Sequence, residues 1–150
     1  MKSDLKKAAA YILFFLYALI MLWLLFGQRI SGSVGADFSY AEHFHLRPFD
    51  TIVYYGGMMM EYPPPSPAFW LGATQIFGNI AMFIPLGFFL PLCFEKLRRF
   101  RVCFPVIVLI DLGIELLQLV LRLGYCETDD LILNIPGACI GFLCFLLLNK

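Results

Sequence analysis

The sequence has few charged residues and none of the common signatures of a catalytic or nucleotide-binding site. Charged residues make up 15% of the chain, whereas soluble domains usually carry about a quarter. There is no HExxH, GxSxG, GxGxxG or P-loop motif, so the sequence does not indicate a zinc peptidase, a serine hydrolase or a nucleotide-binding protein. The formal net charge of zero argues neither for nor against a nucleic-acid partner, and we expect none.

Cysteine and histidine are too sparse to indicate a disulfide framework or a metal site. No CxxC pair is present, and four of the five cysteines lie in or beside apolar segments, so we interpret them as small packing residues. His43 and His45 stand in a loop without any further ligand at metal-binding spacing. We therefore expect no metal and no cofactor.

What the sequence does contain is hydrophobic residues, at 61%, with a mean hydropathy of +0.80. Such a chain indicates an integral membrane protein. A membrane-spanning helix needs about 20 apolar residues. Four runs are long enough, near 8–26, 71–94, 102–121 and 131–148. We predict an all-α bundle of four transmembrane helices that forms one domain over residues 1–150.

The positions of the basic residues predict the orientation. Cytoplasmic loops of membrane proteins are enriched in lysine and arginine. With both termini in the cytoplasm, the basic residues of the N-terminus, the EKLRRFR loop and the C-terminus all lie inside, namely Lys2, Lys6, Lys7, Lys96, Arg98, Arg99, Arg101 and Lys150. The first span is then an uncleaved signal anchor, and the loop between the first two spans lies outside.

This outer loop, residues 27–70, is rich in aromatic residues and methionine. It is broken by Gly56-Gly57 and ends in a cluster of prolines, which prevents one continuous helix. Tyrosine and tryptophan favour the lipid headgroup level, so we expect an interfacial or re-entrant segment. The loop is then either an anchor for the neighbouring spans or a lid over a binding site.

The third span carries a line of polar residues. At about 100 degrees per residue, one helix face holds Asp111, Glu115, Gln118 and Arg122. Ionisable groups at membrane depth usually face the bundle interior or a hydrated cavity. Alternatively, this face serves packing alone, with Glu115 hydrogen-bonded to Gln118 and Asn79.

The second and fourth spans add further polar groups. Gln75 and Asn79 are one turn apart on the second span. On the fourth span the same helical spacing places a carboxylate and an amide above two glycines, at Asp130, Asn134, Gly137 and Gly141. We expect the glycines to let another helix approach closely. We favour a functional cavity in the outer leaflet over packing, because the polar groups outnumber what packing needs.

Four further segments follow one another along the chain: Arg47-Pro48-Phe49, FGNIAMFIPLGFFLPL at 77–92, IELLQ at 114–118 and DDLILNIPGACIGF at 129–142. In this order they resemble the signature motifs of the VanZ-like family of membrane proteins. The chain departs from the family pattern G-R-x-x-D-x-D-D before the paired aspartates. Here LRLGYCETDD puts Arg122 further upstream, Gly124 at the arginine position and Glu127 in place of the earlier aspartate.

The resemblance implies a multi-pass protein of the bacterial plasma membrane. The family's founding member is associated with reduced susceptibility to teicoplanin, a lipoglycopeptide that acts at the cell surface. We therefore expect a protein that binds or remodels a lipid-linked envelope precursor or a lipoglycopeptide among membrane lipids. The expected cavity is lined by Arg47, Asn79, Glu115, Gln118, Arg122, Asp129, Asp130 and Asn134.

Two other functions stay open at this point. In an enzyme acting on a lipid headgroup, Glu115 would be the general acid or base, and Asp129 and Asp130 would position a water or a metal ion. In a small transporter, Asp111 and Glu115 would relay protons. No internal repeat supports the transporter.

Overall fold

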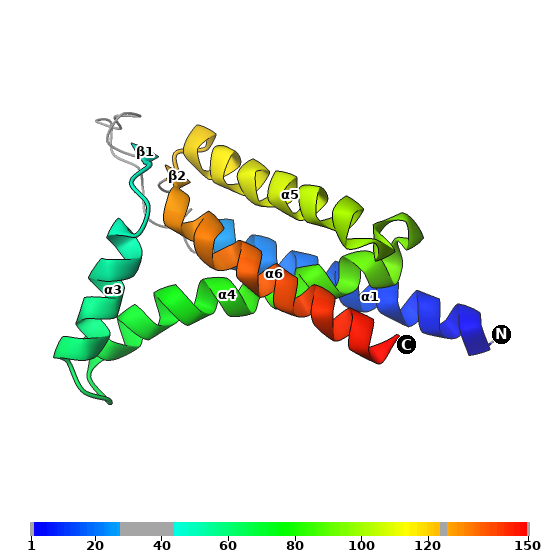
Figure 1. The fold of residues 1–150 in the computed structure, drawn as a ribbon, viewed down its shortest axis with the longest axis horizontal. Coiled ribbons are helices and arrows are strands. Elements are labelled where there is room, and N and C mark those ends of the chain that lie inside the picture. Colours follow the sequence, from blue (N-terminus) through cyan, green and yellow to red (C-terminus); the bar gives the residue numbers. More distant parts are fainter. Residues whose placement is uncertain (1, 28–43, 124–125, 150) are drawn as a thin grey trace.

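The computed structural model of the protein describes residues 2–27, 44–123 and 126–149. The chain is almost entirely helical, and Figure 1 shows the long helices running side by side. The elements are α1 (Lys2–Leu22), the π-helical turn η1 (Trp23–Gly27), β1 (Phe44–His45), α3 (Asp50–Glu61), α4 (Pro67–Cys93), the 3-10 turn η3 (Glu95–Arg98), α5 (Phe100–Val120), β2 (Cys126–Glu127) and α6 (Thr128–Leu148).

Four helical segments are long and apolar enough to cross a membrane. They are Leu5–Gly27, Pro67–Cys93, Phe100–Val120 and Thr128–Leu148. The prediction of an all-α protein with four spans is confirmed, and the predicted boundaries differ from the observed ones by a few residues. The apolar runs determine these spans because, in a bilayer, each backbone polar group must be satisfied within its own helix.

Helices α4 and α6 pack backbone against backbone. A Cβ atom added to Gly87 would overlap the carbonyl oxygen of Ala138, and one added to Gly137 would overlap the carbonyl oxygen of Ile80. Gly141 makes the same kind of approach to α4. Small residues of this kind allow membrane helices to come close enough for extensive van der Waals contact. The predicted glycine face of the fourth span is confirmed, and α4 is the helix that packs against it.

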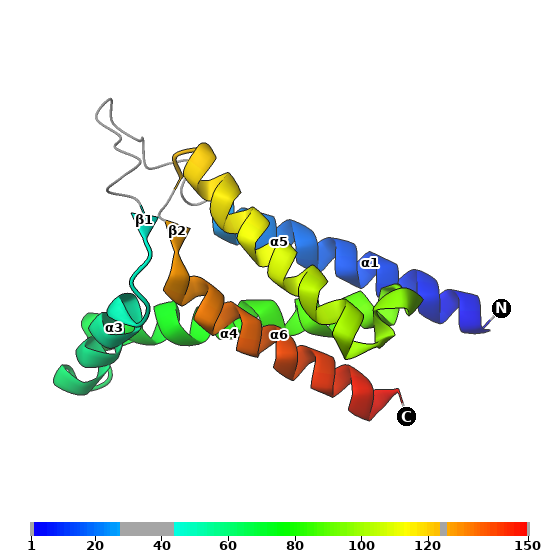
Figure 2. The same ribbon diagram turned by 45° about the horizontal axis from the view of Figure 1, so that its top comes forward.

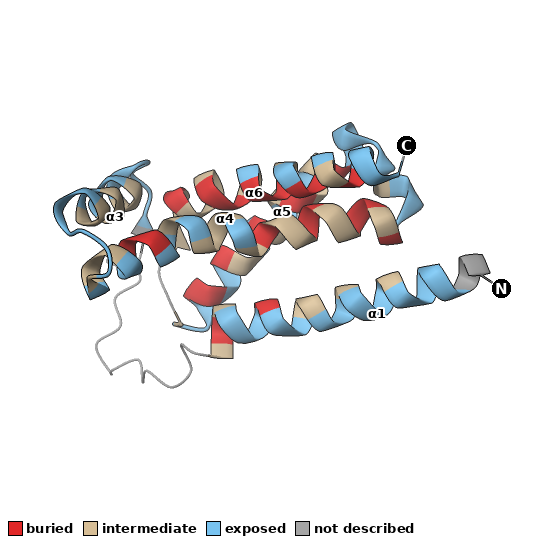
Figure 3. Cartoon of the chain, turned by 90° about the horizontal axis from the view of Figure 1, so that it is seen from below, coloured by how far each residue is buried: buried red, intermediate tan, exposed pale blue. Residues whose placement is uncertain are grey.

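Helix α1 lies at the edge of the bundle. Only 6% of its most apolar window is buried, against 33% in each of the other three spans, and Figure 3 shows it exposed along most of its length. Its anchors are two tyrosine hydroxyls: Tyr17 donates to the Met82 carbonyl at 2.7 Å, and Tyr11 donates to the Cys93 carbonyl at 2.7 Å. Pro85 interrupts the hydrogen-bond ladder of α4 near Met82. Pro85 removes the donor for the neighbouring Ala81 carbonyl, and Tyr17 adds a hydrogen bond to the same turn at Met82.

The apolar core lies in the middle of the bundle. Its fully buried members come from α4, α5 and α6 and include Phe83, Cys103, Ile107, Ala138 and Phe142. All five cysteines are free thiols. Cys103 is fully buried in this core, as expected for a packing residue.

The outer loop forms a separate layer at one end of the bundle. Residues 28–43 of the predicted loop lie outside the described residues. The rest contains β1 and then α3, which runs across the end of the bundle rather than along it (Figures 1 and 2). Strand β1 pairs in parallel with β2, with Phe44 opposite Cys126 and His45 opposite Glu127. The loop is thus attached to the start of α6.

Candidate functional site

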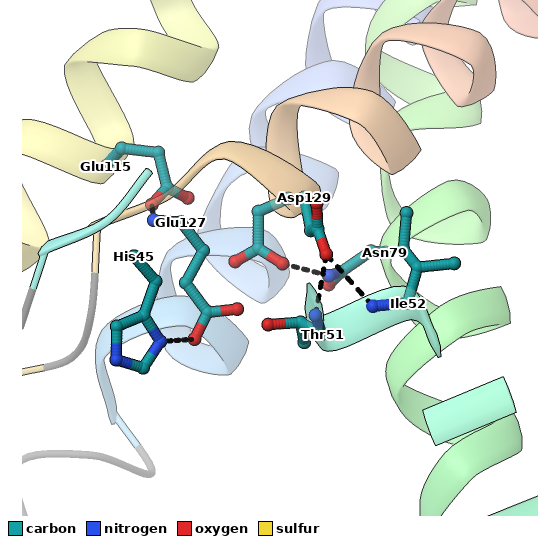
Figure 4. A network of polar contacts seen from close by, with 8 residues as sticks. His45, Thr51, Ile52, Asn79, Glu115, Glu127 and Asp129 are labelled. Atoms are coloured by element: carbon teal, nitrogen blue, oxygen red, sulfur yellow. Dashed lines mark hydrogen bonds and ion pairs between the residues drawn. The ribbon is translucent and has the colours of Figure 1, made fainter. Parts of the chain in front are cut away.

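Asp129 caps the N-terminus of α3 from another helix. The carboxylate accepts hydrogen bonds from the backbone N–H groups of Phe49 at 2.5 Å, Thr51 at 2.8 Å and Ile52 at 2.9 Å. Figure 4 shows the bonds to Thr51 and Ile52. The first N–H groups of a helix have no partner within the helix, and a local side chain usually accepts from them. No local side chain does so here. Asp129 is only 2% exposed, so its first role is to fasten α3 to α6.

Asp130 connects α6 to α4. Its Oδ1 accepts a hydrogen bond from Nδ2 of Asn79 at 2.6 Å. The adjacent acids of the DD pair therefore serve different neighbours, since Asp129 faces α3 and Asp130 faces α4. The sequence predicted that polar groups of the second and fourth spans converge, and this contact brings two of them together.

Glu115 supports β2 from the third span. Its carboxylate is 2% exposed, and Oε2 accepts a hydrogen bond from the backbone N–H of Glu127 at 3.1 Å (Figure 4). The Glu127 side chain in turn lies 3.5 Å from Nδ1 of His45 on β1. In the packing alternative, Glu115 bonds to Gln118 and Asn79; in the structure Asn79 donates to Asp130 and Gln118 donates to the carbonyl of Leu25. Hydrogen-bond partners of this kind depend on how the helices pack, which helical periodicity does not specify.

Asp111 and Asn134 form a buried pair between α5 and α6. Nδ2 of Asn134 donates to Oδ1 of Asp111 at 2.9 Å, and the residues are 3% and 0% exposed. Their other oxygens, Asp111 Oδ2 and Asn134 Oδ1, have no partner among the described residues. Buried acceptors without a donor are costly, so this pair is an energetically strained part of the polar face.

Gln118 and Arg122 separate at the end of α5. Gln118 is 1% exposed and donates through Nε2 to the carbonyl of Leu25 in η1 at 3.1 Å. Helix α5 ends at Val120, and Arg122 has a positive φ of 56°. A left-handed residue commonly ends a helix. Arg122 is therefore exposed beyond the helix and does not continue the polar face that helical spacing predicted.

Two adjoining cavities lie between α3, α4 and the start of α6. The first has a volume of about 160 Å³ and the second about 590 Å³. Thr51, Tyr55 and Glu127 line both, so the two form one cleft. The polar lining of the first cavity consists of Thr51, Tyr55, Gln75, Asn79, Glu127 and Asp130. The second adds His45, Arg47, Asp50 and Tyr54.

Three of the predicted site residues line this cleft: Asn79 and Asp130 in the first cavity and Arg47 in the second. Arg47 is exposed and makes no ion pair within the part of the chain that the structure describes. The other five do not line either cavity, namely Glu115, Gln118, Arg122, Asp129 and Asn134. The sequence prediction missed Thr51 and Tyr55 of α3, for which the aromatic-rich outer loop was the only signal.

The Cys126 thiol lies close to the carboxylates at this end. Burial raises the pKa of Cys126, and the negative charges of Glu115, Asp130 and Glu127 raise it further. A thiol in such surroundings stays protonated and is a poor nucleophile. Among the described residues, no group of three histidine, cysteine or acidic side chains is arranged to hold a metal ion.

Comparison with known proteins identifies the family to which the chain belongs. Residues 12–149 match the VanZ/LLP1 family, which is nearly the whole chain. The chain belongs to this family. No curated protein and no solved structure matches it. The resemblance inferred from the four sequence motifs is thereby confirmed, and the protein is a VanZ-family membrane protein.

Three of the VanZ-like motifs meet at the end of the bundle where α3 lies. Arg47 follows β1, Asn79 lies on α4 and the aspartate pair opens α6, so three motifs contribute to one cleft. The position that departs from the family pattern, Glu127, lies between the two cavities. Gly124 lies outside the described residues.

Proposed function

We propose that this VanZ-family protein binds a polar group of a lipid-linked envelope precursor or of a lipoglycopeptide, and that it thereby contributes to glycopeptide (teicoplanin) resistance in a bacterial plasma membrane. The cleft between α3, α4 and α6 is the observation that carries the proposal. Pockets for small ligands have roughly 300–1,000 Å³. The larger cavity, at about 590 Å³, is in this range.

The location of the cleft supports a ligand that comes from the membrane. The cleft lies where the spans end and α3 crosses the bundle, which is the level of lipid headgroups for a helix of this length. With the predicted orientation, this end faces the outer leaflet. A ligand anchored by an acyl chain would reach the cleft without leaving the bilayer.

The residues divide into two roles under this proposal. Arg47, Asn79 and Asp130 contact the ligand, and the exposed Arg122 supplies a second cation at this end of the bundle. An arginine can bind a phosphate or carboxylate through two parallel hydrogen bonds. The buried residues hold the elements that form the cleft, namely Glu115, Gln118, Asp129 and Asn134.

Growth of a susceptible bacterium under teicoplanin tests the proposal. We expect expression of the protein to raise the inhibitory concentration, and Arg47→Gln and Asp130→Asn to return it to that of cells without the protein at matched membrane levels. Two exposed residues away from the cleft provide matched controls, Arg98→Gln for the arginine and Glu61→Gln for the acid. We expect Asp111→Asn to be milder, because Asp111 lines neither cavity. Unchanged resistance in both cleft variants would contradict the proposal.

A further inference from the structure

Charge is distributed unevenly between the two cavities. Two carboxylates, Glu127 and Asp130, line the smaller cavity, and none of the residues that line it, all of them described, is lysine, arginine or histidine. Arg47 and His45 line the larger cavity only. The raised pKa of the Cys126 thiol has these same carboxylates among its causes. The smaller cavity is therefore lined by acidic groups without a basic one, and the arginine of the cleft, Arg47, lines the larger cavity.

The lining of the smaller cavity is suited to a donor-rich cation. Besides the carboxylates it presents the amides of Gln75 and Asn79 and the hydroxyls of Thr51 and Tyr55. A primary ammonium group has three N–H donors for such acceptors, and its hydrogen bonds to carboxylates are among the strongest in proteins. A trimethylammonium group has no donor and is usually bound by several aromatic rings. Tyr55 is the single aromatic residue that lines this cavity.

The volume of the smaller cavity also favours a small cationic group such as a primary ammonium. The volume of about 160 Å³ is below that of pockets for whole drug-sized ligands, so the cavity accepts one small substituent. Because both cavities share Glu127, a group held at Arg47 and a group held at Asp130 belong to one short ligand. Two adjoining cavities, one lined by carboxylates and the other by an arginine, suit a cation and an anion joined by a short linker.

We propose that the ligand is a zwitterion in which a primary amine enters the smaller cavity between Glu127 and Asp130 while a linked phosphate or carboxylate contacts Arg47. This inference rests on the proposed function and names the class of its ligand. An amine-bearing phospholipid headgroup has this chemistry, as does a free phosphorylated amino alcohol.

Lipid binding by the full-length protein tests the inference. The purified protein is titrated in detergent with phosphatidylethanolamine, phosphatidylcholine and phosphatidylglycerol, and bound lipid is counted by native mass spectrometry. We expect phosphatidylethanolamine to bind about tenfold more tightly than phosphatidylcholine, a difference typical of a charge-assisted hydrogen bond. O-phosphoethanolamine serves as the soluble probe. Displacement of the lipid by it supports recognition of the headgroup in free or lipid-linked form, and an ethanolamine preference without displacement supports the lipid-linked form.

Variants assign the preference to the two cavities. Glu127→Gln keeps its backbone hydrogen bond to Glu115, so it should fold and lose the preference for the amine. Asp130→Asn should do the same, and Arg47→Gln should weaken the binding of all three phospholipids alike. Equal binding of phosphatidylethanolamine and phosphatidylcholine to the unmodified protein, or an amine preference that survives both acid variants, would overturn the inference. If none of the three lipids binds, the inference is overturned as well, whereas the proposed function is decided separately by the growth assay under teicoplanin.

Discussion

Replacing Asp129 should release α3 while leaving the spans in place. The carboxylate accepts from three backbone N–H groups of the segment that starts α3, at 2.5, 2.8 and 2.9 Å. A lost helix cap costs about 0.5–2 kcal/mol, and each hydrogen bond to a charged group contributes about 1.5–3 kcal/mol. In Asp129→Ala, water can take over part of these hydrogen bonds at the exposed start of the helix. We therefore expect the substitution to lower the free energy of local unfolding of α3 by about 2–4 kcal/mol.

Hydrogen exchange measures this local opening. The expected cost corresponds to a roughly 30- to 700-fold larger opening constant for the amides of residues 50–61. Exchange in α4 and α6 should stay unchanged, because the remaining bonds between these helices do not involve Asp129. Asp129→Asn keeps one carbonyl acceptor and should have a smaller effect, about 1–2 kcal/mol.

The control is Glu61→Gln, which removes an exposed acid at the other end of α3. It should leave exchange of the first turn of α3 unchanged. Equal exchange of α3 in Asp129→Ala and in the unmodified protein would refute the reasoning, because it would mean that α3 is held by its apolar contacts alone.

Three further predictions concern the bundle. Gly87→Ala should lower the free energy of unfolding by about 1–3 kcal/mol, and with it the melting temperature in detergent, because the new methyl group overlaps the Ala138 carbonyl. Gly113→Ala, with no atom within 4 Å of the added Cβ, should leave the melting temperature unchanged or raise it. Equal melting temperatures of the two variants would contradict the close packing of α4 and α6. Tyr17→Phe should lower the free energy of unfolding by about 0.5–1.5 kcal/mol, because the hydrogen bond to the Met82 carbonyl is lost. The control Tyr62→Phe changes an exposed tyrosine and should leave the stability unchanged. If Tyr17→Phe is equally stable, α1 does not depend on this hydrogen bond. In a background without native cysteines, an impermeant thiol reagent added to whole cells should label Ser66→Cys and not Arg98→Cys, and the reverse pattern would invert the predicted topology.

The spans and their closest contact follow from local sequence patterns. The apolar run at 131–148 predicted α6, and the spacing of Gly137 and Gly141 predicted a close helix approach. Both depend on rules that act within one segment: membrane thickness fixes the length of a span, and small residues permit contact. The polar faces of α5 and α6 follow from the same helical geometry.

The partners of the buried polar groups do not follow from the sequence in this way. Glu115 bonds to the backbone of a two-residue strand, and Asp129 bonds to a helix about 80 residues earlier in the chain. Such contacts depend on how the elements pack, and helical periodicity carries no information about it. Arg122 shows a second limit of prediction from helical spacing. The spacing extends a helix face only as far as the helix continues, and α5 ends at Val120, before Arg122.

The cap on α3 also sets an order of events during biosynthesis. The N–H group of Phe49 and its acceptor on Asp129 are 80 residues apart in the chain. At about 5–20 residues per second, a ribosome needs about 4–16 s to make that stretch. Before this stretch is finished, the first two spans and α3 have been made, but neither β2 nor the carboxylate that holds α3 has been made. A chain that stalls after α4 ends at Cys93 and before β2 begins at Cys126 therefore carries an α3 segment that is complete in sequence and undocked. With the predicted orientation, this is the form that a protease on the outer face of the membrane would meet.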